Sequence, residues 1–211
     1  MFKDRHDAGK QLAHTLEAYK KTDSIVCALP RGGVVIGYEI AHYLKLPLEI
    51  VITRKIGHPQ SPEYAIGAVT ETGRFIGDEQ ELLSVDKEWL KNEIEKERQE
   101  AVRRKKLYAT DHRKISVKDK TAIIVDDGVA TGLTLSLAIN EVRAEGPREI
   151  VVAVPVISNI VANTISEISD KLVAIETTGD FAGSVGDYYE NFEQLSDNEV
   201  IILLSKLWQK R

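Results

Sequence analysis

The sequence predicts an α/β fold in which a mostly parallel, open sheet is covered by helices on both faces. Short apolar runs alternate with amphipathic segments along most of the 211 residues, as the crossovers between parallel strands require. The runs are nearly continuous in valine, isoleucine, leucine and alanine, which is typical of strands buried on both faces. Five strands are expected, at Ser24–Leu29, Leu48–Thr53, Thr121–Asp126, Glu149–Val156 and Lys171–Thr177.

Amphipathic helices are expected before and between these strands, at Asp4–Lys20, Val34–Leu44, Leu133–Glu145 and Asn159–Ile168. Two segments depart from this alternation. Ala65–Gly77 alternates between apolar and polar residues, which predicts a hairpin or a pair of short strands. Asp86–Tyr108 has an apolar stripe at helical spacing, which predicts a long, charged helix. We interpret the basic run Arg103–Lys106 near its end as a solvated face that suits the helix dipole. Contact with phosphate or nucleic acid is the alternative.

Composition excludes several classes of protein. The net charge of −5 and the pI near 5.6 give no basic field for nucleic acid or an anionic membrane. The single cysteine, Cys27, excludes an internal disulfide framework. No apolar run reaches the roughly 18 residues of a membrane-spanning helix, and the start of the chain is too charged for a secretory signal. We therefore expect a cytoplasmic protein with no membrane or nucleic-acid partner, built as one domain over residues 1–211.

The stretch Thr121–Leu135 carries the strongest chemical signal. A buried strand ends in two adjacent carboxylates, Asp126 and Asp127, and a glycine-containing loop then leads into a helix. The unpaired N–H groups at the start of that helix, with the hydroxyls of Thr131 and Thr134, would form a cradle for a phosphate monoester. The carboxylates are suited to accept hydrogen bonds from vicinal hydroxyls, as on a ribose. The pattern predicts a ribose 5-phosphate site; the alternative is an Asp-rich turn in which Thr131 only caps the helix.

Three segments resemble sequences of one enzyme family. IIVDDGVATGLT resembles the phosphoribosylpyrophosphate (PRPP) motif of the type I phosphoribosyltransferases, and CALPRGGVVIG resembles their pyrophosphate loop. VITRKIGHPQSPEYAIGAV lies where the family places a flexible catalytic loop. The resemblance covers a core at about residues 24–155, with a small hood expected from residues 1–20 and 177–211. It implies transfer of ribose 5-phosphate from PRPP to a nitrogenous base, with release of pyrophosphate and use of Mg²⁺.

The resemblance also assigns the PRPP-binding residues. Asp126 and Asp127 would hold the ribose hydroxyls, and the Arg31 side chain would bond to the pyrophosphate. The 5-phosphate would lie against Gly128, Val129, Ala130, Thr131, Gly132, Leu133 and Thr134, and the pyrophosphate against the backbone N–H groups of Arg31, Gly32 and Gly33. The family also implies a cis peptide bond between Arg31 and Gly32. The alternative for this segment is a tight strand-to-helix turn with a surface arginine.

Three further residues are candidates for catalysis. Arg54 and Lys55 follow a strand, and cations there would stabilise the charge that develops on a leaving pyrophosphate. Ala130 stands where hypoxanthine-type family members carry an aspartate that handles a proton on the base. The motif therefore resembles the adenine type, in which a glutamate of the flexible loop has that task, and Glu63 is the nearest candidate. We expect Gly57–Tyr64 to be a mobile lid that carries it. A solvated surface role is the alternative for each of the three residues.

An aromatic cluster near the C-terminus has two open interpretations. Its members either stack a planar base above the ribose site or cover the sheet edge or a dimer contact. They are Phe181, Tyr188, Tyr189 and Phe192.

The expected partners are PRPP and a small-molecule base, and the expected assembly is a homodimer. Mg²⁺ should bind mainly through PRPP and keep several waters, so no dedicated protein site for a metal is expected. The alternative function is a PRPP- or nucleotide-sensing regulator on the same fold, without turnover. The acid pair and the cations at Arg31, Arg54 and Lys55 favour the enzyme.

Overall fold

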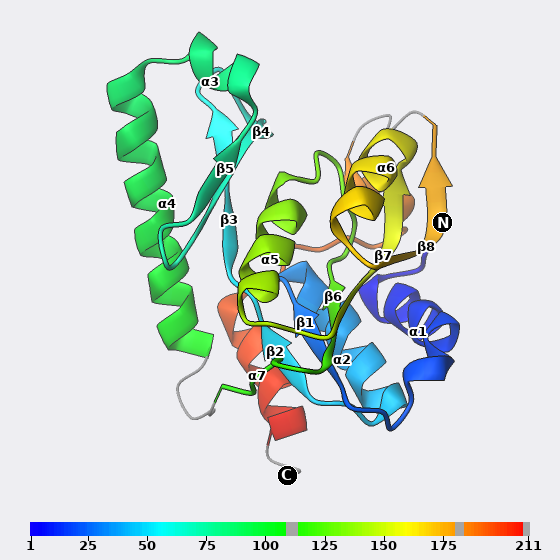
Figure 1. Cartoon of the computed structure of the whole chain (residues 1–211). Helices are drawn as coiled ribbons and strands as arrows, with labels where there is room; N and C mark the ends of the chain where they lie inside the picture. The colour runs from blue at the N-terminus through cyan, green and yellow to red at the C-terminus, as the bar shows by residue number, and fades with distance from the viewer. Residues whose placement is uncertain (109–113, 180–183, 209–211) are drawn as a thin grey trace.

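A five-stranded parallel sheet forms the centre of the fold, as the sequence predicts (Figure 1). The computed structural model describes residues 1–108, 114–179 and 184–208. The strands are β1 (Ser24–Ala28), β2 (Leu48–Ile50), β6 (Thr121–Val125), β7 (Glu149–Ser158) and β8 (Lys171–Thr178), in the order β2-β1-β6-β7-β8. Every neighbouring pair is parallel. The carboxyl ends of the strands therefore meet at one edge of the sheet, where open α/β sheets bind ligands.

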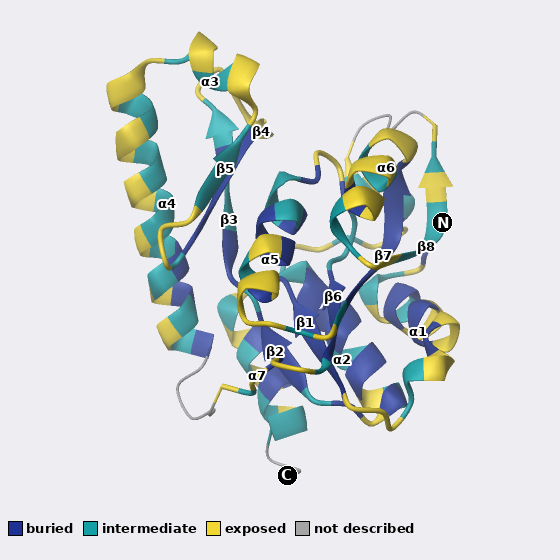
Figure 2. Cartoon of the chain, viewed as in Figure 1, coloured by how far each residue is buried: buried dark blue, intermediate teal, exposed yellow. Residues whose placement is uncertain are grey.

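Helices cover both faces of this sheet. One face carries α1 (Arg5–Thr15), α2 (Gly32–Leu44) and α7 (Asp197–Trp208), and the other carries α5 (Leu133–Ala144) and α6 (Asn159–Ile168). Successive residues of a strand point to opposite faces, so Val26 and Ile123 belong to the first apolar layer and Ile25 and Ile124 to the second. The central strands are consequently buried on both sides (Figure 2). Two short 3₁₀ helices, η1 (Glu17–Tyr19) and η2 (Val185–Tyr188), complete this part.

A second, antiparallel sheet lies beside the first. Its strands β3 (Thr53–His58), β4 (Ser61–Thr70) and β5 (Phe75–Gly77) are joined to α3 (Glu79–Ser84) and α4 (Lys87–Tyr108). Ile56, Ile66 and Val69 form a small core, against which Trp89 and Leu90 of the helical part pack. Figure 1 shows α4 running along this sheet. The predicted hairpin and the predicted long helix are both confirmed.

The strand expected at Leu48–Thr53 is in fact divided between the two sheets. β2 ends at Ile50, and the N–H of Val51 makes one more bond, at 3.0 Å, to the carbonyl of Ala28. Thr53 then begins β3 and pairs with β4 instead of β1. One continuous apolar run in the sequence therefore contributes to both sheets. No change in its pattern of apolar and polar residues marks where the chain passes from the first sheet to the second.

The expected lid, residues 57–64, is largely strand. Pairing between β3 and β4 extends to His58 and Ser61, with register shifts on either side of Gly57. A Cβ atom at Gly57 would lie 2.3 Å from the carbonyl oxygen of Pro62, so glycine lets the two strands approach there. A backbone ladder therefore holds the segment that was expected to be a mobile lid, and its mobility stays a prediction.

The N-terminal segment pairs with the segment that precedes α7. The N–H of Phe2 donates to the carbonyl of Tyr188 and the N–H of Glu190 to the carbonyl of Phe2, both at 2.8 Å. The helix expected at Asp4–Lys20 begins after Asp4, whose carboxylate caps it, and ends at Thr15. Within the described residues, no helix combines the length and the apolar character that crossing a membrane requires.

Candidate functional site

A cavity of about 710 Å³ opens beyond the carboxyl ends of β1 and β6. Most of the candidate site residues that were predicted from the sequence line this cavity. Those on its wall are Arg31, Gly32, Arg54, Lys55, Glu63, Asp127, Gly128, Val129, Ala130, Thr131, Gly132 and Thr134. Asp126, Gly33 and Leu133 lie outside this wall. Gly33 has a packing role instead, because a Cβ atom there would lie 2.8 Å from the carbonyl oxygen of Val125.

The start of α5 leaves a row of backbone donors at the cavity. Gly132 precedes the helix with φ +79°, a conformation that favours glycine. The N–H of Ser136 makes the first helical bond, to the carbonyl of Gly132 at 2.8 Å. Among the described residues, no side chain caps this helix, so Thr131 does not have the capping role that was the alternative for this loop. The free N–H groups and the positive end of the helix dipole suit an anion.

The acid pair is held from several directions. The Nε of Arg5 donates to Oδ2 of Asp127 at 2.6 Å, and the hydroxyl of Tyr189 donates to the Asp127 carbonyl at 2.6 Å. Asp126 accepts the N–H of Asp127 at 2.9 Å. Burial, and after it the charge of Asp127, raises the pKa of the Asp126 carboxyl well above its ordinary value. A Cβ atom on Gly32 would lie 1.7 Å from Oδ2 of Asp127, so glycine at this position gives the carboxylate its space.

Arg5 is a site residue that the sequence reasoning missed. Its guanidinium lies 3.6 Å from the centre of the Phe192 ring and donates to the carbonyl of Glu193 at 2.8 Å. Phe192 lies on the cavity wall, whereas Tyr189 is buried between Phe2 and Phe192. Tyr189 therefore covers the core, and Phe192 presents an aromatic side chain to the cavity. Tyr188 is half-buried and packs against the apolar layer on the α1 and α2 face of the sheet. Phe181 lies outside the described residues.

The turn after β1 differs in one detail from the expectation. The cis peptide bond joins Pro30 to Arg31 and not Arg31 to Gly32. Arg31 precedes α2 and already has helical backbone angles (φ −95°, ψ −44°). The peptide bond between Arg31 and Gly32 is therefore part of the start of the helix. No hydrogen bond or ion pair joins the Arg31 side chain to another residue of the described chain.

The cations of β3 are each paired with a carboxylate. Arg54 contacts Glu97 of α4 at 2.7 Å, and Lys55 contacts Glu63 at 2.8 Å. The Glu63 side chain is 96% exposed. The hydrogen bond and the charge of Lys55 lower the pKa of Glu63, so this carboxylate is ionised at neutral pH and is a weak proton acceptor while the pair persists.

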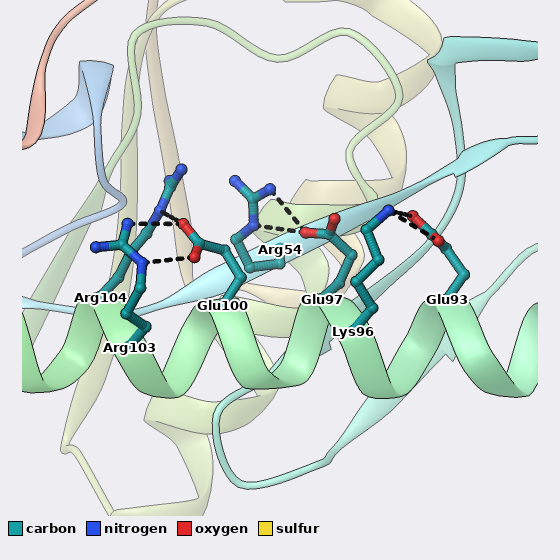
Figure 3. Close-up of polar contacts among 7 residues, drawn as sticks. All are labelled: Arg54, Glu93, Lys96, Glu97, Glu100, Arg103 and Arg104. Carbon is teal, nitrogen blue, oxygen red and sulfur yellow. Dashed lines mark hydrogen bonds and ion pairs between the residues drawn. The ribbon is translucent and has the colours of Figure 1, made fainter.

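The basic run at the end of α4 divides between surface and cavity. Arg103 is half-exposed and pairs with Glu100 and Asp197, whereas Arg104 is buried and lines the cavity (Figure 3). The interpretation of the run as a solvated face is therefore wrong for Arg104. The signal was available, because Arg104 lies three residues after Ala101 and four before Tyr108, which share the buried stripe of the helix.

Comparisons with known proteins give consistent results. The family model described as "Phosphoribosyl transferase domain" matches residues 4–193. Two Mycobacterium tuberculosis proteins, named "Putative phosphoribosyl transferase MT0597" and "Putative phosphoribosyl transferase Rv0571c", are each 36% identical over 208 residues, which are 98% of this chain and 47% of theirs. The chain thus spans about half the length of these relatives. The crystal structure of TT1426 from Thermus thermophilus has a TM-score of 0.78 and 36% identity, with 98% of both chains covered.

Proposed function

The chain belongs to the phosphoribosyl transferase domain family, and from this premise we propose that it transfers ribose 5-phosphate from PRPP to a nitrogenous base and releases pyrophosphate. The observation that carries the proposal is the placement of three chemically distinct groups around one cavity. Free N–H groups begin α5, the Asp127 carboxylate lies on the cavity wall with Asp126 directly before it in the chain, and several cations line the same cavity. These groups match a phosphate monoester, a ribose diol and a diphosphate.

The proposed binding mode follows from that chemistry. The 5-phosphate lies against residues 128–134, where N–H groups and the hydroxyls of Thr131 and Thr134 donate. The ribose hydroxyls donate to the carboxylates of Asp126 and Asp127. The diphosphate lies toward Arg31 and the cations of β3. As the bond to the sugar carbon breaks, negative charge grows on the diphosphate, and fixed cations stabilise it more strongly than they stabilise the ground state.

Glu63 is the proposed catalytic carboxylate of the acceptor side. It lies on the cavity wall at the start of β4, while Ala130 brings no titratable group to the loop before α5. The lowered pKa of Glu63 favours a role in stabilising positive charge on the base over one in storing a proton. Phe192 is the proposed aromatic surface for a planar base.

We propose that Mg²⁺ accompanies PRPP and is held mainly by the diphosphate. The carboxylates on the cavity wall fit this arrangement, because Asp127 is paired with Arg5 and Glu63 with Lys55, and Mg²⁺ prefers phosphate oxygens and water. When bound, the ion neutralises part of the charge on the leaving diphosphate.

The expectations of a single domain, a homodimer and a cytoplasmic location remain proposals. The cavity wall supports a hood built from residues 1–20 and 177–211, since Arg5, residues 184–186, Phe192, Gln194 and Leu195 contribute to it. Sedimentation analysis tests the dimer, and cell fractionation tests the location.

The decisive experiment measures pyrophosphate release from PRPP and Mg²⁺ with a panel of purines and pyrimidines. Base-dependent release, with formation of the matching nucleotide, supports the enzyme. PRPP binding by calorimetry without turnover on any base would support the regulator instead. Absence of both would refute the PRPP site.

A further inference from the structure

We propose that Arg104 of α4, oriented by Glu100, binds the diphosphate group in this cavity. The inference rests on the proposed function, because it takes the diphosphate of PRPP as the ligand. It assigns a ligand-binding side chain to a helix that lies outside the segments that resemble the PRPP motif and the pyrophosphate loop.

The Arg104 side chain is buried at the cavity with little of its donor capacity used within the described residues. The residue is 9% exposed and lies on the cavity wall. Its Nε donates to Oε1 of Glu100 at 2.8 Å, and within the described residues Glu100 is its only hydrogen-bond or ion-pair partner. In Figure 3 the terminal nitrogens of Arg104 point away from α4. A guanidinium has five N–H donors, and leaving charged donors unsatisfied in a buried position is costly. An anion in the cavity would satisfy them.

Charged side chains are distributed unevenly around the cavity. Four lining cations come from the turn after β1, from β3 and from α4, namely Arg31, Arg54, Lys55 and Arg104. The fifth, Arg5, is held by Asp127. Residues 128–134 carry no charged side chain. The more highly charged diphosphate therefore suits the cation side, and the monoester suits the N–H groups.

Arg104 and the turn after β1 line the same cavity. Burial and the hydrogen bond to Asp197 raise the pKa of Tyr108, while the charges of Arg104 and Arg31 both lower it. The Tyr108 hydroxyl is thus within electrostatic range of both guanidinium groups. A forked cation there adds directional donors that a lysine cannot supply.

Glu100 acts as a positioning residue. It accepts bonds from Nε of Arg104 and from Nε and Nη2 of Arg103. This arrangement fixes the plane of the Arg104 guanidinium and leaves its terminal nitrogens for a ligand. Arg103 shares the same carboxylate, but its side chain is 50% exposed and is absent from the cavity wall. Arg103 is therefore a matched control for charge, helix position and partner.

The test is calorimetric titration of two ligands, inorganic pyrophosphate with Mg²⁺ and ribose 5-phosphate. We expect Arg104→Gln to weaken pyrophosphate binding by roughly ten- to a hundredfold and to leave ribose 5-phosphate binding unchanged. Arg104→Lys should lose less pyrophosphate affinity, because lysine keeps the charge but lacks the forked donors of a guanidinium. Glu100→Gln should also lose less pyrophosphate affinity than Arg104→Gln. Arg103→Gln should bind both ligands as the unaltered protein does.

The outcomes separate this inference from the proposed function. Equal pyrophosphate affinity in Arg104→Gln would overturn the inference and leave the proposed function standing. Equal weakening of both ligands would also overturn it, because Arg104 would then act on the cavity as a whole. Binding of neither ligand by the unaltered protein would overturn both. If Arg104→Gln fails to fold, Arg104→Lys is titrated with the same two ligands instead. Unchanged pyrophosphate affinity in Arg104→Lys would show that the forked donors of the guanidinium do not contribute to binding.

Discussion

The Nε of Arg5 lies 2.6 Å from Oδ2 of Asp127, so the first turn of α1 holds a carboxylate of the loop that follows β6. Both side chains are largely buried, at 11% and 17% exposed. Since removing one partner leaves the other charge unpaired in a poorly solvated position, either single substitution should destabilise the fold.

We expect a coupling free energy of about 1–3 kcal/mol between Arg5→Gln and Asp127→Asn. Urea unfolding of the two single variants and the double variant measures it. Lys10→Gln, at an exposed position of the same helix, is the control and should leave stability unchanged within about 0.5 kcal/mol. Strict additivity of the two substitutions would show that the contact contributes nothing.

The acid pair should control PRPP affinity. Asp126→Asn with Asp127→Asn leaves two ribose hydroxyls poorly paired and should weaken PRPP binding by about 1–3 kcal/mol for each lost charged hydrogen bond. Calorimetry with PRPP and Mg²⁺ measures the loss, and the thermal midpoint without ligand shows that the variant folds. Unchanged affinity in a folded double variant would remove the ribose assignment.

Asp126 should make the stability of the protein depend on pH. The pKa of Asp126 is near 3.8 in the unfolded chain and is raised in the folded state. At pH values between these two pKa values, the folded protein binds more protons than the unfolded chain does. Stability therefore falls as pH rises through that interval, by about 1.4 kcal/mol for each unit by which the pKa is raised. Asp126→Asn removes this dependence and should gain stability over the unaltered protein as pH rises.

Urea unfolding at pH values from about 4 to about 8 tests the expectation for Asp126, because the folded and unfolded states differ in bound protons within that interval. Asp119→Asn, at an exposed turn, is the control. A stability difference for Asp126→Asn that stays constant with pH would contradict the raised pKa.

Glu63 should affect turnover more than PRPP binding. Glu63→Gln keeps the size of the side chain and removes its charge, and should lower turnover with the correct base by roughly ten- to a thousandfold. PRPP affinity should barely change. Steady-state kinetics and calorimetry measure the two quantities, with Glu79→Gln at an exposed position of α3 as the control. Unaltered turnover would assign Glu63 to the solvated surface.

The central sheet was predictable because its strands are buried on both faces. The runs Ala122–Val125 and Ile150–Ile157 are apolar without interruption and therefore stand out from the amphipathic helices beside them. The division of Leu48–Thr53 between two sheets was not predictable from this apolar composition, because a buried strand and the start of a second sheet have the same composition. The hairpin at residues 57–64 was missed because its prolines, glycine and polar residues are also typical of a loop.

The candidate site was predictable where one continuous segment carries it. The loop from Asp126 to Thr134 needs only a strand end, a glycine and a helix start, all of which are local. Arg5 and Arg104 reach the cavity from α1 and α4, and no local pattern brings them to Asp127 or to the turn after β1. For Arg104 the sequence does carry a signal, because a basic residue on an otherwise buried helical stripe indicates a cation that faces the interior.

The pairing of the N-terminal segment with residues 188–191 has a consequence for synthesis on the ribosome. Phe2 bonds to Tyr188, and Arg5 lies against Phe192. A nascent chain that has not yet released residues 184–195 has the sheet and the loop before α5, but part of the cavity wall is missing. Ligand binding stabilises only a state that has the site, and chains emerge from their N-terminal end. A ligand of this cavity should therefore stabilise only a chain that has released these residues, and before that point the nascent chain depends on its own apolar core.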